Sequence, residues 1–260
     1  MDLGINGKTA LVLGAGGGLG SAISQCLAKE GVNVALADIN LEAANSARSL
    51  LPENASSMCL KWDLANLEAI ESNVAQIEQE LGSVDILVNN TGGPPPSPIA
   101  NQSIELWQTW YETMVLPVIA ITDRILPGMK QKQWGRIVTS TSSGVIAPIP
   151  NLGLSNTLRS ALLGWSKTLA SEIGSDGITS NIVLPGRIST SRILFLDEKK
   201  AEREGRQVDD VRKESLSSIP AGRYGEPNEY GQVVTFIASQ AASYINGSVI
   251  RIDGGYISSI

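Results

Sequence analysis

The sequence predicts one α/β domain in which a parallel β-sheet is covered by helices on both faces. Short runs of β-branched and other apolar residues alternate with longer amphipathic segments, which is the order of repeated strand–helix–strand units. The chain has 260 residues, a length that one hydrophobic core supports. It contains no internal repeat, low-complexity tract or linker-like change in composition, so a single domain is expected.

Five short segments have the composition of strands that are buried on both faces of a sheet. They are residues 9–14, 32–38, 84–90, 135–140 and 178–186. Amphipathic patterns typical of helices lie between them, for example over residues 21–31 and 67–82. The glycines that close these two patterns, Gly31 and Gly82, predict that each helix ends with glycine at its C′ position.

Two segments depart from this alternation. Residues 91–98 (TGGPPPSP) contain too much proline for a strand or a helix and predict a stiff loop at the carboxyl edge of the sheet. Residues 197–214 carry seven acidic and six basic side chains, which favours a solvated helix interrupted by Gly205. The alternative is a mobile lid over about residues 191–219 that covers a ligand. Its apolar underside would consist of Leu194, Phe195, Leu196 and Ile219.

Charge and hydropathy exclude several classes of partner. The net charge of −6 provides no basic surface for a phosphate backbone, so no nucleic-acid partner is expected. No apolar run approaches the 18 or so residues of a membrane span, and the first residues lack the pattern of a signal peptide. The chain is therefore expected to be a cytoplasmic protein without a membrane partner that acts on small molecules.

The absence of histidine removes most hydrolytic chemistry. Without imidazole there is no Ser-His-Asp or Cys-His nucleophile and no HExxH zinc site. The two cysteines, Cys26 and Cys59, are too far apart in sequence for C-x-x-C spacing, so no zinc site or disulfide framework is expected. The remaining chemistry uses Ser, Tyr, Lys, Arg, carboxylates or a bound organic cofactor.

A glycine-rich turn directly after the first predicted strand indicates a phosphate-binding site. Gly14, Gly18 and Gly20 have the spacing G-x-x-x-G-x-G, and a predicted helix follows them. Glycine allows the tight turn and the close approach of the backbone to a pyrophosphate, and the free N–H groups at the helix start attract negative charge. The common G-x-G-x-x-G spacing is absent, because Leu19 stands where its last glycine would fall.

Asp38 at the end of the second predicted strand indicates which dinucleotide binds. A carboxylate at this place accepts hydrogen bonds from the adenosine ribose. The same carboxylate would repel a 2′-phosphate, and no Lys or Arg lies at residues 15–17 or at Ile39 and Asn40 to compensate. NAD is therefore favoured over NADP. The alternative is that Asp38 only caps the following helix.

Six separate motifs resemble those of the short-chain dehydrogenase/reductase family, particularly its 3-oxoacyl-acyl-carrier-protein reductase-like members. They are LGAGGGLG at 13–20, WDL at 62–64, NNTG at 89–92, GRIV at 135–138, PGRIST at 185–190 and IDGG at 252–255. The resemblance covers nearly the whole chain. It implies a Rossmann-like, doubly wound, seven-stranded parallel sheet with the cofactor across the carboxyl ends of the strands. Family members are usually tetramers or dimers, so a homo-oligomer is expected.

The resemblance also implies the residues that hold the cofactor. Asp63 and Leu64 would hold adenine, and Ile188 and Thr190 would meet the nicotinamide carboxamide. The full set implied by the turn, Asp38 and the resemblance is Gly14, Gly18, Leu19, Gly20, Asp38, Asp63, Leu64, Asn90, Thr91, Gly92, Arg159, Pro185, Gly186, Ile188 and Thr190.

The catalytic positions depart from the family pattern. The family uses a Tyr-x-x-x-Lys pair, a Ser thirteen residues before the Tyr, and an Asn on the preceding long helix. Aligned through GWSKTLASE at 164–172, the Tyr, Lys and Ser positions hold Ser155, Arg159 and Ser142. Trp107 and the Leu126-Pro127 pair bracket the Asn position at Met114. Only the serine is retained, and the expected catalytic set becomes Ser142, Ser155 and Arg159.

Two functions follow from this departure. The first is an NAD-dependent oxidoreductase that acts on a ketone or secondary alcohol through this altered site, because general acid–base help is worth only about 10²- to 10⁴-fold and orientation supplies more. The second is a nucleotide-binding protein without turnover that uses NAD as a structural or sensing ligand. Tyr111 lies near the position of Met114, but an aromatic residue there is more often packed in a core or an interface.

Overall fold

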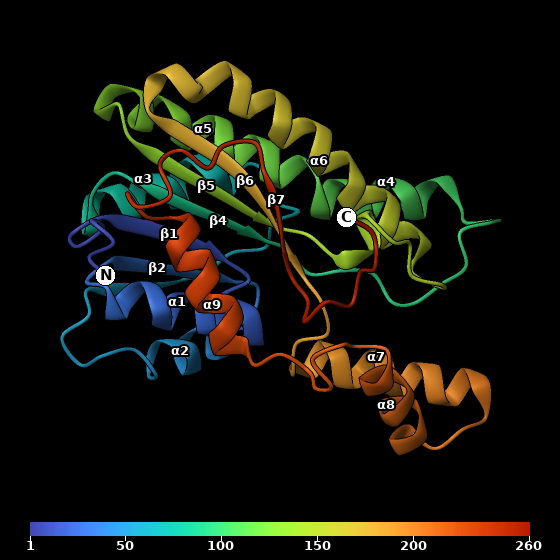
Figure 1. Ribbon diagram of the computed structural model, residues 1–260. Coiled ribbons are helices and arrows are strands. Elements are labelled where there is room, and N and C mark those ends of the chain that lie inside the picture. Colours follow the sequence, from blue (N-terminus) through green and yellow to red (C-terminus); the bar gives the residue numbers. More distant parts are fainter.

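The computed structural model describes residues 1–260 as one domain around a seven-stranded, entirely parallel sheet (Figure 1). The strand order is β3-β2-β1-β4-β5-β6-β7. The strands are β1 (Thr9–Leu13), β2 (Asn33–Asp38), β3 (Ser57–Lys61), β4 (Ile86–Asn90), β5 (Gly135–Ser140), β6 (Ile178–Pro185) and β7 (Val249–Ile252). The order reverses between β1 and β4, and a crevice forms at this point outside the carboxyl ends of the strands.

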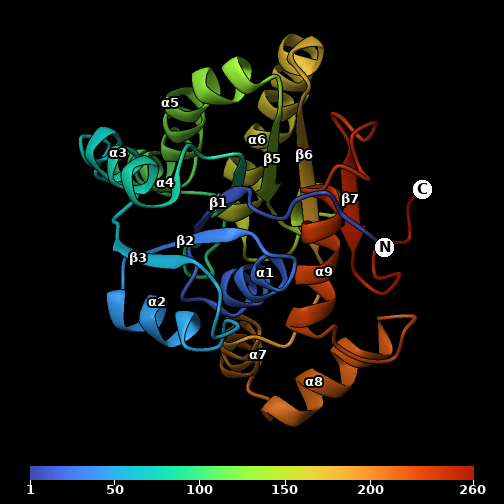
Figure 2. The same cartoon turned by 90° about the vertical axis from the view of Figure 1, so that its left-hand side faces the viewer.

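Helices cover both faces of the sheet, as Figure 2 shows along the sheet edge. One face carries α1 (Gly18–Lys29), α2 (Leu41–Arg48) and α9 (Pro227–Ile237); the other carries α3 (Ala69–Leu81), α4 (Ile104–Met114), α5 (Leu116–Lys132) and α6 (Gly153–Ile173). Two short 3₁₀ turns, η1 (Ser143–Val145) and η2 (Gly174–Asp176), adjoin α6. Two further helices, α7 (Ser191–Glu204) and α8 (Val208–Ser217), project below the sheet at its carboxyl edge (Figure 1).

The central strands are buried on both faces, which explains their nearly continuous apolar sequence. All five predicted strands are present, and their ends differ from the predicted ends by at most two residues. The edge strands β3 and β7 are visible in the structure but not in the sequence pattern, because they are partly exposed and include polar residues. None of the helices combines the length and the apolar character needed to span a bilayer.

One of the two glycines predicted at a helix C′ position is found there, and the other lies one position earlier, at the C-cap. Gly31 adopts a φ of 77° one residue after the cap of α1, as predicted. Gly82 is itself the cap of α3, with φ 90° and ψ 168°, and is not in the left-handed C′ conformation. The chain therefore turns directly from α3 toward β4.

The charged segment 197–214 forms two solvated helices, and Gly205 interrupts them with a φ of 62°. A buried carboxylate fastens the first of them to the domain. Asp197 accepts a 2.6 Å hydrogen bond from Arg187, which follows β6, and a 2.7 Å bond from the hydroxyl of Tyr224 before α9. This bridge fixes α7 beside the carboxyl edge of the sheet.

Candidate active site

A cavity of about 540 Å³ lies along the carboxyl edge of the sheet. The segments that follow strands β1 to β6 line it, together with α6 and one face of α7. Its position at the reversal of strand order is the usual ligand site of doubly wound sheets. It is within the size range of small-molecule and cofactor sites.

The glycine turn between β1 and α1 forms one end of the cavity. Gly14 adopts a φ of 60°, a conformation that glycine reaches without strain, and Asn90 donates to the carbonyls of Leu13 and Gly14 at 3.2 and 3.3 Å. Gly20 does not line the cavity. A Cβ on Gly20 would lie 2.2 Å from the Gly14 carbonyl oxygen, so this glycine allows α1 to pack on the turn.

Asp38 lines the cavity beside the glycine turn and is not the cap of the following helix. Its carboxylate accepts from the backbone N–H of Gly16 at 2.9 Å and from that of Asn40 at 2.9 Å. The cap of α2 is Asn40, whose side chain accepts from the N–H groups of Glu42 and Ala43. The capping alternative for Asp38 is therefore excluded.

The structure brings the other predicted residues to this one cavity. Those lining it are Gly14, Gly18, Leu19, Asp63, Leu64, Asn90, Thr91, Gly92, Pro185, Gly186, Ile188 and Thr190. Thr190 lies close to the turn, because a Cβ on Gly18 would be 2.8 Å from its methyl group. Residues 172 positions apart thus share one wall, and Gly20 is the single member of the predicted binding set that does not line the cavity.

Ser142, Ser155 and Arg159 also line the cavity, at the end opposite Asp38 along the strand order. Ser142 follows β5, and its hydroxyl accepts from the N–H of Gly144 at 3.1 Å, which leaves its own O–H free to donate. Ser155 and Arg159 are buried one turn apart on α6, where Arg159 Nε donates to Ser155 Oγ at 3.3 Å.

Backbone carbonyls hold the Arg159 guanidinium in place. It donates to the carbonyls of Ser140 (3.4 Å), Thr91 (3.1 Å) and Gly92 (2.8 Å). Burial, together with the nearby positive charge of Arg192, lowers the pKa of Arg159 to about 10. The group remains protonated at neutral pH, so the site contains a fixed positive charge without a carboxylate partner.

Met114 does not face the cavity. It is 1% exposed and packs with Val115, Val118, Leu158 and Leu162 between α4 and α6. Its neighbour Thr113 reaches the cavity and is a polar residue that the sequence analysis did not identify. Tyr111 is 41% exposed and lies neither in the core nor in the cavity.

The lining face of α7 differs from the predicted one. Of the four apolar residues expected beneath the lid, only Leu196 lines the cavity; Leu194 is exposed, and Phe195 and Ile219 pack elsewhere. The α7 residues that line the cavity are Ser191, Arg192, Ile193, Leu196, Lys200 and Arg203. Four of them, Arg192, Leu196, Lys200 and Arg203, are spaced three or four residues apart and mark one face of the helix. Sequence alone did not show which face points inward, because the crossing of α7 over the sheet edge decides it.

Two phenols lie near the site, and only one reaches the cavity. Tyr256, after the C-terminal IDGG motif, lines it and was missed by the sequence analysis. Tyr230 on α9 is fully buried behind Ser140, with 2.7 Å between the two hydroxyl oxygens. Burial raises the pKa of Tyr230 well above its usual value. Tyr230 thus supports Ser140 and retains its proton.

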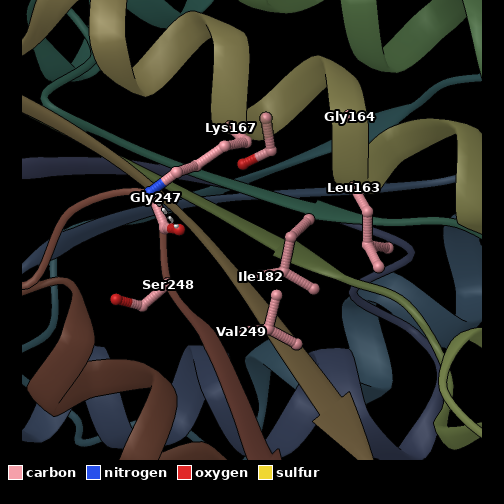
Figure 3. A pocket seen from close by; sticks show the side chains of 8 residues that line it. Leu163, Gly164, Lys167, Ile182, Gly247, Ser248 and Val249 are labelled. Atoms are coloured by element: carbon pink, nitrogen blue, oxygen red, sulfur yellow. Dashed lines mark hydrogen bonds between the residues drawn. The ribbon is translucent and has the colours of Figure 1, made fainter.

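A second cavity of about 310 Å³ lies apart from this site, between α6, β6 and β7 (Figure 3). Leu163, Ile182 and Val249 form an apolar wall, and Lys167 is its only charged group. Lys167 donates to the carbonyl of Gly247 at 3.1 Å. A single lysine bound to the backbone offers no acid–base pair, so this cavity has no catalytic constellation.

The fold and the main cavity define a doubly wound α/β protein with a ligand-sized cavity at the point where the strand order reverses. Residues 14–257 match the family model described as enoyl-(acyl carrier protein) reductase. The chain therefore belongs to the short-chain dehydrogenase/reductase family. This confirms the resemblance seen in the six sequence motifs.

Three similar proteins illustrate the range of the family. The chain is 34% identical to 3-oxoacyl-[acyl-carrier-protein] reductase FabG of Vibrio cholerae, over 96% of this chain and 98% of that protein. L-sorbose reductase from Gluconobacter frateurii, solved with NADPH and L-sorbose, has a TM-score of 0.93 at 29% identity over all of both chains. An NAD+-bound xylitol dehydrogenase has a TM-score of 0.90 at 27% identity, over 96% of this chain and 99% of that chain.

Proposed function

We propose that this protein is an NAD(H)-dependent oxidoreductase that interconverts a ketone and a secondary alcohol. The observation that supports this most strongly is that one cavity contains the glycine turn, Asp38 and the Ser142–Ser155–Arg159 group. The relatives named above are oxidoreductases, two of which are reductases by name. A small-molecule carbonyl or alcohol is the substrate class that this site suits.

The residues present fit a nicotinamide adenine dinucleotide. The crowded glycines leave backbone N–H groups free beside the start of α1, where a pyrophosphate is stabilised. The Asp38 carboxylate faces the cavity, where it suits ribose hydroxyls and repels a 2′-phosphate. Lys200 and Arg203 also line the cavity, but both are paired with glutamates and do not offset this repulsion. We therefore propose NAD as the preferred cofactor.

The nicotinamide, when bound, supplies or accepts the hydride. We propose that the Ser142 hydroxyl donates a hydrogen bond to the substrate oxygen. The fixed charge of Arg159 stabilises the negative charge that develops on this oxygen during reduction, and this compensates in part for a missing phenolic acid. Ser155 accepts from Arg159 and keeps the guanidinium oriented. An alcohol such as Ser155 is a much weaker acid than a phenol, so the proton comes from water or from an acidic group of the substrate.

We propose that α7 and α8, over about residues 191–219, act as a lid on the cavity. This is supported by Leu196 and three cations of α7, which line the cavity.

Family membership favours a cytoplasmic homo-oligomer, a tetramer or a dimer. Light scattering after size-exclusion chromatography tests the assembly, and a monomeric mass would contradict it.

A nucleotide-binding protein without turnover is the second candidate. It is favoured by the burial of Met114 and by the carbonyls that already occupy most Arg159 donors. A Ser155→Tyr, Arg159→Lys double variant, which restores a phenol–ammonium pair, would create reductase activity in such a protein.

The deciding experiment measures NADH oxidation and NAD reduction over a panel of ketones and secondary alcohols, with Ser142→Ala and Tyr256→Phe beside the wild type. We expect turnover by the wild type and a loss of roughly 10²-fold or more in Ser142→Ala. An equal loss in Tyr256→Phe alone would transfer the proton-donor role to that phenol. NADH binding without turnover of any panel member would favour the second candidate.

A further inference from the structure

Five cations line the main cavity, and two of them have no acidic partner. Arg187 is paired with Asp197, Lys200 with Glu214 and Arg203 with Glu204. The cavity-lining acids, Asp38 and Asp63, instead accept from backbone N–H groups near the adenosine end. The two cations that remain are Arg159 and Arg192.

These two guanidiniums converge on one point of the loop after β4. A Cβ placed on Gly93 would lie 3.3 Å from Nη2 of Arg159 and 3.5 Å from Nη2 of Arg192. Arg159 donates to the carbonyl of Gly92, and Arg192 donates to that of Pro94 at 2.7 Å. The prolines of this loop hold those carbonyls in a stiff frame, so the frame fixes both side chains.

Without a bound anion, the repulsion between the Arg159 and Arg192 charges destabilises the folded protein. Arg159 is buried and Arg192 is partly buried, and two like charges repel each other more strongly there than in bulk solvent. Burial lowers the pKa of Arg192 as it does that of Arg159. A bound carboxylate would remove the repulsion and would accept charge-assisted hydrogen bonds.

The two arginines have different free donors. Arg159 uses its Nε and both terminal nitrogens on four protein acceptors. Arg192 donates one hydrogen bond to the protein, so most of its planar fork is free to hold a carboxylate. Both line the same cavity as Ser142 and Ser155.

We infer that the substrate carries a carboxylate bonded to its carbonyl or hydroxyl carbon, or one methylene away from it, held by the fork of Arg192 and the fixed charge of Arg159. A 2-oxo or 3-oxo acid, or the matching hydroxy acid, has this arrangement. The inference rests on the proposed function for its reacting group, but the anion site itself is a property of the two arginines. The cofactor's phosphates are the other possible anion, and the experiment separates the two.

The test compares a charged probe with a neutral probe of nearly the same shape. Calorimetry measures the binding of 2-oxo-4-phenylbutanoate and of its ethyl ester to the protein with and without saturating NADH. We expect the acid to bind about tenfold more tightly than the ester. In Arg192→Gln this ratio should fall to roughly twofold or less, while NADH affinity stays within roughly threefold. Lys199→Gln is the control, because Lys199 lies on the same helix, pairs with Glu202 and does not line the cavity.

Three results would overturn the inference. They are equal binding of acid and ester by the wild type, an unchanged ratio in Arg192→Gln, and a loss of NADH affinity in Arg192→Gln that exceeds the loss for the acid. If NADH does not bind at all, the proposed function fails, but the ratio measured without NADH still decides the anion site. If Arg192→Gln does not fold, Arg192→Lys replaces it; this variant keeps the charge, loses the fork and should lower the ratio by about threefold.

Discussion

Single side chains at the carboxyl ends of strands decide what this site can hold. Asp38 is the last residue of β2 and accepts two backbone hydrogen bonds, so its carboxylate is oriented before any ligand arrives. Ser142 follows β5 and keeps a free hydroxyl hydrogen. Arg159 brings a charge that carbonyls hold in place. Each of these residues has a separate, measurable role.

Asp38→Asn tests the choice of cofactor. The amide keeps an acceptor for Gly16 but removes the charge that favours ribose hydroxyls and repels a 2′-phosphate. Since a hydrogen bond to a charged group is worth about 1.5–3 kcal/mol, the ratio of NAD to NADP affinity should fall about tenfold or more. Calorimetric titration with both cofactors measures it. Glu42→Gln, a surface change on α2, should leave the ratio unaltered, and an unaltered ratio in Asp38→Asn would refute the assignment.

At the scale of elements, two anchors position the helices around the cavity. Asp197 fastens α7 through Arg187 and Tyr224. Glu229 closes the first turn of α9, where it accepts from the backbone N–H of Glu226 at 2.7 Å and from Arg223 at 2.7 and 2.8 Å. The first anchor is buried and the second is exposed, so they respond to different perturbations.

Asp197→Ala should release α7 and α8 from the domain. The change leaves the Arg187 charge and the Tyr224 hydroxyl without their partner, and breaking a buried pair in this way costs about 3–5 kcal/mol. Limited proteolysis should then cut within residues 198–217 much faster than in the wild type. Asp209→Ala, which removes an exposed carboxylate of α8, should not accelerate cleavage. Equal cleavage of all three proteins would show that the bridge does not hold the helix.

Glu229→Gln gives a pH-dependent effect on stability. Hydrogen bonds from Arg223 lower the pKa of Glu229 to about 2. Because the folded protein lowers this pKa, the carboxylate stabilises the fold above the unfolded value near 4.5, and this contribution disappears as the pH falls toward 2. The variant should therefore melt a few degrees lower than the wild type at pH 6–7, on the order expected for a lost cap, and the gap should narrow below about pH 4.5 and be mostly lost near pH 2. A constant gap from pH 7 to 2.5 would contradict this account.

At the scale of the whole molecule, ligand binding and the folding equilibrium are thermodynamically linked. A ligand that binds only the folded protein stabilises it, by about 2.7 kcal/mol at 100 times its dissociation constant. For a chain of this size, NAD at that concentration should raise the melting temperature by about 5–10 °C. NADP at the same concentration should give a smaller rise. Differential scanning calorimetry measures both, and the absence of any rise with either cofactor would remove the proposed function.

Much of the architecture could be predicted from sequence because its signals are local. Strand burial on both faces requires continuous apolar runs, and the tight turn requires glycine at Gly14 and Gly20. The edge strands β3 and β7 lack this signal because they are half exposed. Asp38 was identified from its place after a strand, and most residues expected to contact the cofactor do line the cavity.

The sequence alone determined the family, the order of the elements and most of the positions expected to contact a cofactor, because each depends on residues close together in the chain. The tertiary structure decided which side chains meet: Arg159 with Arg192, Tyr256 with the cavity, and Met114 with the core. It also decided that α7 presents three cations to the cavity beside Ile193 and Leu196, rather than the four apolar side chains expected. Such contacts join residues far apart in sequence through the crossing angles of packed helices, and these angles leave no mark in the local pattern.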